Sequence, residues 1–436
     1  MPQGTSVPAS ELHVFLGSEP IGRLDPQPRR SREHVRFRWS TDASRLQVRI
    51  SESFAMTTMR APDSQTVSRF LGGYLPEGNQ RKAMAAVRGI DDRDLFGFLE
   101  AFGGSIAGAL SFHTSDAPPP KKADYIPLTP AALRKSLKQS VEMHDQAVRD
   151  DSRSMLPGFQ PKLLVAKLDS GDRRWLSPVG RSHSTHILKP QLRSAPTRIY
   201  DEHYGHQLAT RLGLSTFKTA IHSSAQTAYL AIERYDRQVD NGTVTCVHQE
   251  DAAQALSLDW TSDSFKFQDR DNPGSSRYAS ARRVGELAGT LTDPDAPKVW
   301  VRQFVFRILI GDNDGHAKNT GILHHPGSDT IADLYDAIPN MFQPGRIDWS
   351  MAYAVNSNFD HRRVTLDDIV AEVTSWRLMS ESRAEALVSE CMREFSEALD
   401  LQRVPAGASP SVGDALKYYV TRLQGGHRIG AFAGDS

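Results

Sequence analysis

The chain has few cysteines, which limits the kinds of site and compartment it can belong to. Its 436 residues include only Cys246 and Cys391. Two cysteines are too few for a disulfide framework or a cysteine-based zinc site. We therefore expect a protein of a reducing compartment, the cytoplasm.

Long apolar runs are also missing. No stretch of about 18 apolar residues occurs, so a membrane-spanning helix is not expected. The N-terminus has no basic region followed by an apolar core, which argues against a secretory signal. The sequence thus predicts a protein that neither spans a membrane nor is secreted.

An excess of charge of one sign is the third absence. Lys and Arg together number 52, as do Asp and Glu, so there is no global basic field to attract nucleic acid. Any contact with DNA is expected to come mainly through a partner. The 39% hydrophobic and 24% charged residues are typical of a globular protein, and the length predicts two or three lobes.

The most informative stretch that is present is the polar loop 311–319, which follows an apolar, helix-like run over 299–309. Asp314 and Asn319 lie in this loop, and Asp336 follows in a strand-like segment. Phosphoryl transfer needs an Asp that deprotonates a hydroxyl, and Asn and Asp oxygens that hold magnesium. Taken alone, the loop could also be an ordinary Asp/Asn turn, and Asp333 could compete with Asp336.

A lysine at the end of a predicted strand forms the second feature. Lys189 ends the β-branched, apolar segment 184–190, and Glu202 comes thirteen residues later at the start of a predicted helix over 201–213. In kinases, such a carboxylate holds the ammonium that contacts the nucleotide phosphates. A solvated lysine and a glutamate that favours a helix N-terminus are the alternative.

A glycine-containing segment, 152–162, precedes an apolar β-run. Such a loop can fold over nucleotide phosphates and offer them backbone N–H groups, because glycine lets the chain approach closely. A hairpin turn is the alternative. The candidate nucleotide contacts of this loop are Leu156, Pro157, Gly158, Phe159, Gln160 and Lys162.

Three later segments carry further expectations. The strand 227–235 runs into charged residues, and Glu233 and Tyr235 fall where the chain between two kinase lobes would read an adenine edge. The segment 245–256 is predicted to start a helix capped near His248; its polar residues favour structural support or substrate positioning near the active site over metal binding. The polar and aromatic segment 265–278 is expected to be a surface insertion.

The segments 158–162, 185–190 and 311–319 together resemble the motifs of HipA-family serine/threonine kinases, the toxins of bacterial toxin–antitoxin pairs. The resemblance covers nearly the full length. It implies an α+β, two-lobed, protein-kinase-like fold. The expected parts are a β-rich N-terminal subdomain over 1–115, a kinase N-lobe with the phosphate loop over 124–240, and a mostly helical C-lobe with the catalytic loop over 241–436.

The resemblance also implies ATP and Mg²⁺ as cofactors. Asp314 would accept the hydroxyl proton, and Asn319 and Asp336 would be magnesium ligands. Lys318 would neutralise charge on the transferred phosphate, and His316 would have a mainly structural role in the catalytic loop.

The partners implied are a HipB-like helix-turn-helix antitoxin that also binds operator DNA, and a protein substrate such as an aminoacyl-tRNA synthetase, whose modification halts translation. Family members autophosphorylate a serine three residues before the loop glycine. Met155 stands at that position here, so Ser154 fits only after a one-residue shift, and Ser152 lies nearby.

Two other functions are consistent with the same residues. The first is a kinase that acts on a small molecule or lipid, since the sequence does not reveal the acceptor site. The second is a catalytically silent, kinase-like binding module. Such a module would normally have lost the base, the lysine or a metal ligand, and all of these are present here.

Overall fold

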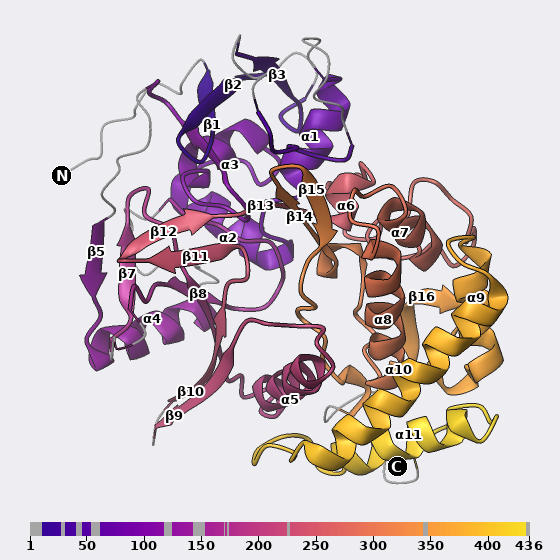
Figure 1. Ribbon diagram of the computed structural model, residues 1–436. Helices are drawn as coiled ribbons and strands as arrows, with labels where there is room; N and C mark the ends of the chain where they lie inside the picture. The colour runs from indigo at the N-terminus through magenta and orange to yellow at the C-terminus, as the bar shows by residue number, and fades with distance from the viewer. Residues whose placement is uncertain are drawn as a thin grey trace.

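The protein has a two-lobed α+β fold, as the sequence predicts (Figure 1). The computed structural model describes residues 11–27, 31–40, 46–53, 62–116, 124–142, 153–169, 171, 174–224, 227–342 and 348–432. Buried apolar side chains form one core in the N-terminal subdomain, a smaller one in the N-lobe, and the largest in the C-lobe. Within the described ranges, no helix is both long and apolar enough to cross a membrane.

The N-terminal subdomain is an antiparallel sheet covered by helices. Its strand order is β3-β2-β1-β4. In β3, alternate side chains are buried, so the period-two pattern of this segment places one face on the core. Its elements are β1 (Leu12–Leu16), β2 (Glu19–Pro26), β3 (Val35–Trp39), α1 (Ser64–Gly72), α2 (Gly78–Arg88), α3 (Leu95–Phe102) and β4 (Leu110–His113).

The N-lobe is built on a second antiparallel sheet, with the order β6-β8-β10-β9. Helix α4 packs against β6 and β8, and α5 packs against β9 and β10. Two further two-stranded antiparallel sheets belong to this lobe: β5 with β7, and the hairpin of β11 and β12. The bounds are β5 (Asp124–Pro127), α4 (Pro130–Glu142), β6 (Leu163–Val165), β7 (Leu176–Val179), β8 (His186–Pro190), α5 (Arg198–Arg211), β9 (Thr219–Ser224), β10 (Thr227–Glu233), β11 (Arg237–Asp240) and β12 (Thr243–Cys246).

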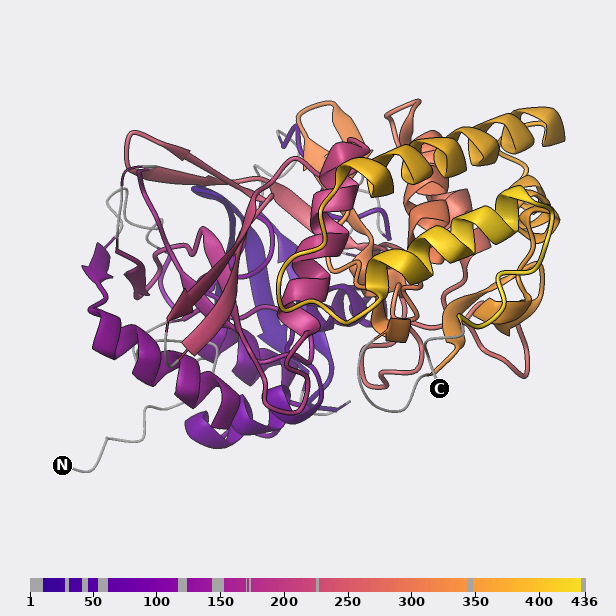
Figure 2. The same ribbon diagram turned by 90° about the horizontal axis from the view of Figure 1, so that it is seen from below.

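The C-lobe is mostly helical and is organised around α8, whose Trp300 and Val305 are fully buried. Helices α7, α10 and α11 pack on α8, and Figure 2 shows α10 and α11 on the outer side of this lobe. The helices are α6 (Ala252–Ala255), α7 (Ala281–Ala288), α8 (Ala296–Leu309), α9 (Leu366–Ser375), α10 (Glu381–Leu401) and α11 (Val412–Gln424). The strands are β13 (His248–Asp251), β14 (Gly321–His325), β15 (Ser328–Ile331), β16 (Ser350–Val355) and β17 (Asn358–Asp360).

The prediction of a helix capped near His248 is wrong. Residues 248–251 form strand β13, which pairs with β14, and the helix begins only at Ala252. Asp251 is its N-cap: the Asp251 carboxylate accepts from the Gln254 backbone N–H, and the Gln254 side chain accepts from the Asp251 N–H, each at 2.9 Å. This reciprocal capping box fixes the helix start three residues later than expected.

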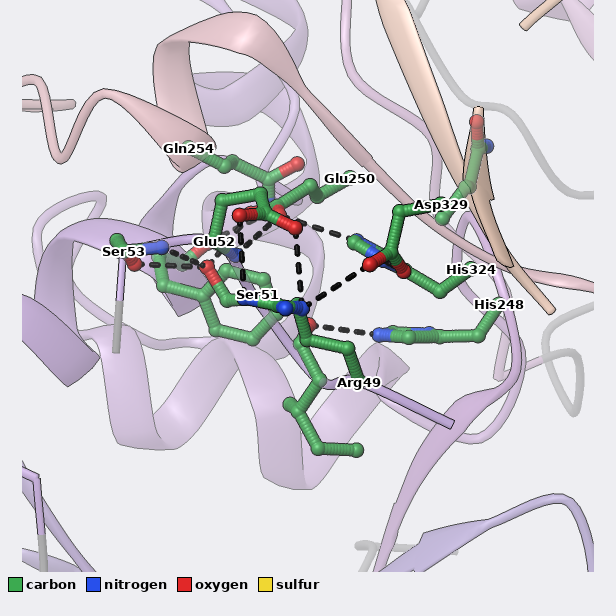
Figure 3. A network of polar contacts seen from close by, with 12 residues as sticks. Arg49, Ser51, Glu52, Ser53, His248, Glu250, Gln254, His324 and Asp329 are labelled. Atoms are coloured by element: carbon green, nitrogen blue, oxygen red, sulfur yellow. Dashed lines mark hydrogen bonds and ion pairs between the residues drawn. The ribbon is translucent and has the colours of Figure 1, made fainter. Parts of the chain in front are cut away.

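A buried polar network joins the N-terminal subdomain to β13, β14 and β15 (Figure 3). The Glu250 carboxylate accepts from the Ser51 hydroxyl at 2.6 Å and from the Glu52 backbone N–H at 2.7 Å. His324 lies between Asp329 at 2.7 Å and Glu250 at 3.1 Å. Arg49 completes the network through Asp329 at 3.2 Å and Glu52 at 3.1 Å.

This network is an ion-pair cluster in which ligand atoms of Glu52, His324 and Asp329 lie within 4.8 Å of one another. Both ring nitrogens of His324 already contact carboxylates, and the pKa of this histidine is raised to about 9. A protonated imidazole has no lone pair for a metal. The network therefore serves to dock the segment 49–53.

We expect this docking to weaken at alkaline pH. Burial alone would lower the pKa of His324, but Asp329 and Glu250 raise it to about 9, above its ordinary value of 6.5. A group whose pKa is raised on folding stabilises the protein fully below its unfolded pKa, and this contribution is lost as pH rises through the folded pKa. The melting temperature of the wild-type protein should therefore fall between about pH 7 and about pH 9.5.

The variant His324→Gln provides the comparison, because it cannot titrate in this range. Its melting temperature should be lower near neutral pH and should depend less on pH over the same window. Parallel profiles for the two proteins would show that His324 does not stabilise the docked segment through its charge.

Candidate active site

A cavity of about 230 Å³ lies where the N-terminal subdomain, the N-lobe and the C-lobe meet. The structure brings together here nearly every residue singled out from the sequence. Those that line the cavity are Leu156, Pro157, Gly158, Phe159, Gln160, Lys162, Lys189, Glu202, Glu233, Tyr235, Asp314, His316, Lys318, Asn319 and Asp336. Ser154 is not among them, and Ser152 lies outside the described residues.

Lys189 links the two lobes across this cavity. It lies on β8, and its Nζ is 2.7 Å from Glu202 Oε1 on α5 and 2.6 Å from Asp336 Oδ1 in the C-lobe. Only 9% of the lysine side chain is exposed. Burial alone would raise the pKa of Asp336, but Lys189 and Lys162 hold it well below its usual range. The sequence predicted the pair with Glu202, whereas the direct contact with Asp336 was not foreseen.

Asp336 adopts a backbone conformation that is uncommon for residues other than glycine, with φ of +54°. Such a conformation costs on the order of 1 kcal/mol and persists only where neighbouring contacts impose it. The preceding Tyr335 supplies two of these: its carbonyl accepts from Arg307 at 3.1 Å, and its hydroxyl donates to the Lys318 carbonyl at 2.8 Å. The chain therefore turns at Asp336 and presents the carboxylate to Lys189.

Arg307, at the end of α8, holds the loop that carries Asp314 and Asn319. Its guanidinium is buried, forms an ion pair with Asp312, and donates to the Asn319 carbonyl at 2.7 Å. Asp312 in turn accepts from the Asp314 N–H at 3.0 Å, and the Asn319 amide donates to the Asp314 carbonyl at 2.9 Å. Sequence reasoning missed Arg307, although a charged residue within the apolar run 304–309 was a signal.

Asp314 is the most exposed acid of the catalytic loop, with 49% of its side chain open. Burial and the Asp312 carboxylate raise the pKa of Asp314 to about 6, and Lys266 opposes this shift. His316 Nε2 is 3.8 Å away, and burial holds the pKa of His316 well below its usual range. The neutral His316 ring packs edge-on against Phe267, with centroids 5.0 Å apart.

Lys318 lines the cavity but faces the N-terminal subdomain. Its Nζ donates to the Gly73 carbonyl at 2.7 Å and lies 3.3 Å from Glu77 Oε1. Glu77 was not among the predicted site residues.

The segment 265–278 is not simply the surface insertion that the sequence suggested. Lys266 is 5% exposed, lines the cavity, and places its Nζ 2.5 Å from Glu77 Oε2. Its backbone carbonyl accepts from the Ala317 N–H at 3.1 Å, so this segment also packs on the catalytic loop. A polar segment can be taken as exposed only when its charged side chains have no buried ion-pair partner. Lys266 has such a partner in Glu77.

The loop 156–162, expected to bind phosphate, includes a glycine that no other residue could replace without strain. Gly158 has φ of +109°, and a Cβ there would lie 2.6 Å from Lys162 Nζ. Lys162 donates to the Pro157 carbonyl, and burial and the neighbouring Lys189 lower the pKa of Lys162 to about 8. When the Gln160 amide is oriented with its oxygen toward Arg198, this oxygen accepts from two nitrogens of the Arg198 guanidinium at the start of α5.

The two residues expected near an adenine, Glu233 and Tyr235, also line the cavity. The Tyr235 hydroxyl donates to Gln249, and its ring stacks on Tyr335 with centroids 5.3 Å apart. Glu233 is 41% exposed and accepts from the Lys218 N–H at 3.1 Å. Apolar side chains complete this end of the cavity, which is what a flat aromatic base requires; they are Ile187, Phe217, Ile232 and Leu334.

Ser154 is buried beside the cavity, outside its lining. It forms a short parallel bridge with Ser105, and the neighbouring Met155 N–H donates to the Ser105 carbonyl at 3.1 Å. Ser154 is 1% exposed, and its hydroxyl makes no hydrogen bond. Phosphorylation of Ser154 would therefore require this segment to leave its place in the subdomain.

We expect Lys189→Met to destabilise the protein. The variant would leave Glu202 buried without its ion-pair partner, which typically costs about 3 kcal/mol or more. An unpaired buried carboxylate takes up a proton more readily in the folded protein than in the unfolded chain. The loss of melting temperature relative to wild type should therefore be smaller at about pH 5 than at about pH 7. Thermal unfolding at both pH values measures this.

The double variant Lys189→Met with Glu202→Gln is the matched control, because it removes the unpaired buried charge. It should recover part of the lost stability at neutral pH. Equal melting temperatures for the single and double variants would contradict the assignment of this ion pair as buried and mutually dependent.

The two-lobed fold, with a lysine–glutamate pair and an acidic loop facing one cavity, defines a kinase-like protein. Models of two protein families match the chain: the HipA N-terminal domain over residues 12–113 and the HipA-like C-terminal domain over residues 154–399. The second match covers more than half of the chain. The protein belongs to the HipA family.

Relatives and a solved structure agree with this assignment. The chain is 29% identical over 325 residues to the protein named "Putative kinase Y4mE" of Sinorhizobium fredii, a match that covers 73% of each chain. It is 26% identical over 431 residues to "Putative kinase Y4dM" of the same organism, covering 95% of this chain and 97% of that one. The HipA chain of Shewanella oneidensis MR-1, solved with HipB and operator DNA, has the same fold: the TM-score is 0.80 at 22% identity, over 95% of this chain and 97% of that one.

Proposed function

We propose that this protein is an ATP-dependent serine/threonine protein kinase and the toxin of a toxin–antitoxin pair. The observation that carries the proposal is the convergence of Lys189, Glu202, Asp314 and Asp336 on one cavity. The alternative of a silent binding module is disfavoured because each of these groups is present and none is displaced from the cavity.

Lys189 and the phosphate loop would bind the nucleotide phosphates. Glu202 holds the ammonium of Lys189 at 2.7 Å, and the loop around Gly158 can bring backbone N–H groups close to phosphate oxygens. Lys162 adds a second ammonium at the same end of the cavity. The relatives named as putative kinases support the use of ATP.

Asn319 and Asp336 would hold the magnesium ion. Both offer the hard oxygen donors that Mg²⁺ prefers, and 36% of the Asp336 side chain remains exposed beside its contact with Lys189. The donor set therefore fits this metal. When bound, Mg²⁺ would neutralise charge on the nucleotide phosphates.

Asp314 would orient the acceptor hydroxyl and accept its proton. The hydroxyl oxygen forms a bond to the γ-phosphorus, the bond from that phosphorus to the bridging oxygen breaks, and ADP leaves. The proton of the hydroxyl passes to the Asp314 carboxylate. A half-exposed carboxylate at the mouth of the cavity suits this step, because the acceptor must reach it from outside.

A groove beside the cavity supports a protein acceptor over a small molecule or lipid. It measures about 720 Å³, is open to solvent, and shares Asp314 and Arg198 with the nucleotide cavity. An extended polypeptide fits an open, polar groove of this kind, whereas small ligands are usually enclosed in apolar pockets. Further polar residues that line the groove are Gln268, Asp269, Asn313, Asn340, Asp348 and Ser350.

The proposed partners follow from the family. The Shewanella HipA structure includes HipB and operator DNA, which supports a HipB-like antitoxin that neutralises the kinase and contacts the operator. The equal numbers of basic and acidic residues agree with leaving most DNA contact to that partner. For the phosphorylated target, we propose a cellular protein such as an aminoacyl-tRNA synthetase, whose modification would inhibit translation and growth.

Transfer of labelled phosphate from ATP tests the proposal. With the purified protein in cell lysate, a labelled protein band is expected, and this band should decrease by about 100-fold or more with Asp314→Asn, because a positioned general base contributes about that much. The variant should keep the wild-type melting temperature. Label found only in small molecules would favour the small-molecule or lipid kinase, and no label would favour the silent module.

Asp333→Asn is a matched control for this experiment. Asp333 lies three residues before Asp336, but its carboxylate accepts from Thr216 and does not line the cavity. This variant should transfer phosphate at nearly the wild-type rate. Transfer that survives in Asp314→Asn would remove Asp314 from the mechanism.

A further inference from the structure

Glu77, in the N-terminal subdomain, is an acidic residue buried at the phosphate end of the cavity. It directly precedes helix α2, at the N-cap position, and is 5% exposed. A residue at this position usually accepts a hydrogen bond from the first turn of its helix. The Glu77 side chain makes no such capping bond, so its carboxylate is available for contacts outside its own subdomain.

Each carboxylate oxygen of Glu77 contacts a different lysine. Oε2 lies 2.5 Å from Lys266 Nζ, and Oε1 lies 3.3 Å from Lys318 Nζ. The lysine side chains are 6% and 13% exposed. Lys318 belongs to the catalytic loop, whereas Lys266 lies in the segment that packs on this loop. One carboxylate thus fixes two ammonium groups from different parts of the C-lobe.

The two lysines border the place where the phosphate loop meets the catalytic loop. Lys266 Nζ lies 4.5 Å from the centroid of the Phe159 ring in the phosphate loop. Burial raises the pKa of Asp314, and the charge of Lys266 opposes this rise. Both lysines line the same cavity as these residues. A phosphoryl group that moves from the loop toward Asp314 would therefore pass beside them.

Charged groups of both signs meet at this point. Burial alone would raise the pKa of Glu77, but Lys318 and Lys266 lower it to about 2, so this carboxylate is ionised at neutral pH. Asp251 lies 4.0 Å from Lys318, and burial raises the pKa of Asp251 to about 6. Because a carboxyl group with a pKa of about 6 is also mostly ionised at neutral pH, two carboxylates balance the two ammonium groups, which are held at the cavity wall by these ion pairs.

We propose that Glu77 is a positioning residue for phosphoryl transfer, which holds Lys266 and Lys318 where the γ-phosphoryl group of ATP is transferred. The N-terminal subdomain then completes the active site instead of only packing beside it. This inference rests on the kinase function proposed above. The lysines would offset the charge that spreads over the phosphoryl oxygens during transfer.

Glu77 also helps to join the N-terminal subdomain to the C-lobe, so a loss of activity could have a purely structural cause. The network of Figure 3 allows the two causes to be separated. Arg49 docks the same subdomain through Asp329 at 3.2 Å, yet neither residue lines the cavity. Arg49→Gln therefore weakens docking without touching the two lysines.

The experiment compares Glu77→Gln, Lys266→Met and Arg49→Gln in the full-length protein, by melting temperature and by steady-state transfer from ATP. We expect Glu77→Gln and Lys266→Met each to lower kcat by about 10-fold to 100-fold, while the KM for ATP changes less than about 3-fold, because misplacement affects the transfer step most. Arg49→Gln should lower the melting temperature but keep kcat. The combined Glu77→Gln and Lys266→Met variant should lose less than the product of the single effects.

Two results would overturn the inference. One is a wild-type kcat for Glu77→Gln, and the other is an equal loss of kcat in Arg49→Gln. If Glu77→Gln fails to fold, Lys266→Met answers the same question from the other side of the contact. Full activity of Glu77→Gln with an inactive Asp314→Asn would refute only this inference, whereas transfer that survives in Asp314→Asn, or no transfer by the wild type, would refute the proposed function as well.

Discussion

The ion pairs of Lys189 are the interaction on which the arrangement of the two lobes depends. The lysine lies on the N-lobe sheet, Glu202 on α5, and Asp336 in the C-lobe. Placing an ammonium in a buried position is unfavourable unless charged partners surround it. The fold meets this condition by turning the chain at Asp336 into a positive φ, with Arg307 bonded to the preceding carbonyl. Strand β8, helix α5 and the turn at Asp336 are thus linked by one charge.

Much of the fold and most of the candidate site could be predicted because the informative residues are close together in sequence. Lys189 and Glu202 are thirteen residues apart, and Asp314 and Asn319 are five apart. Strands and amphipathic helices of ordinary period surround them, so residue type and spacing were enough to place each on an element. The β-rich N-terminal subdomain and the mostly helical C-lobe were implied by the family resemblance and are present in the structure.

The rest could not be predicted, because it depends on contacts between distant buried charges. Glu77 and Lys266 are separated by 189 residues. The residues next to each of them in sequence do not indicate that the two side chains form an ion pair. A buried lysine in a polar segment has the same local pattern as an exposed one, which explains why 265–278 was taken for a surface insertion. The helix start near His248 was misplaced for a related reason: the pairing of β13 with the distant β14 overrides local propensity.

Strand β13 shows how one short polar segment can serve two units of the protein at once. Side chains alternate along a strand, and the contacts of this one follow that alternation. His248 and Glu250 bond to the N-terminal segment 50–52, whereas Gln249 bonds to Tyr235 and Asp251 caps α6 and approaches Lys318. Polar side chains are costly to bury without partners, and here every one has a partner. The strand therefore couples the docking of the N-terminal subdomain to the wall of the cavity, and the same residues that resemble a metal site by composition are required for packing.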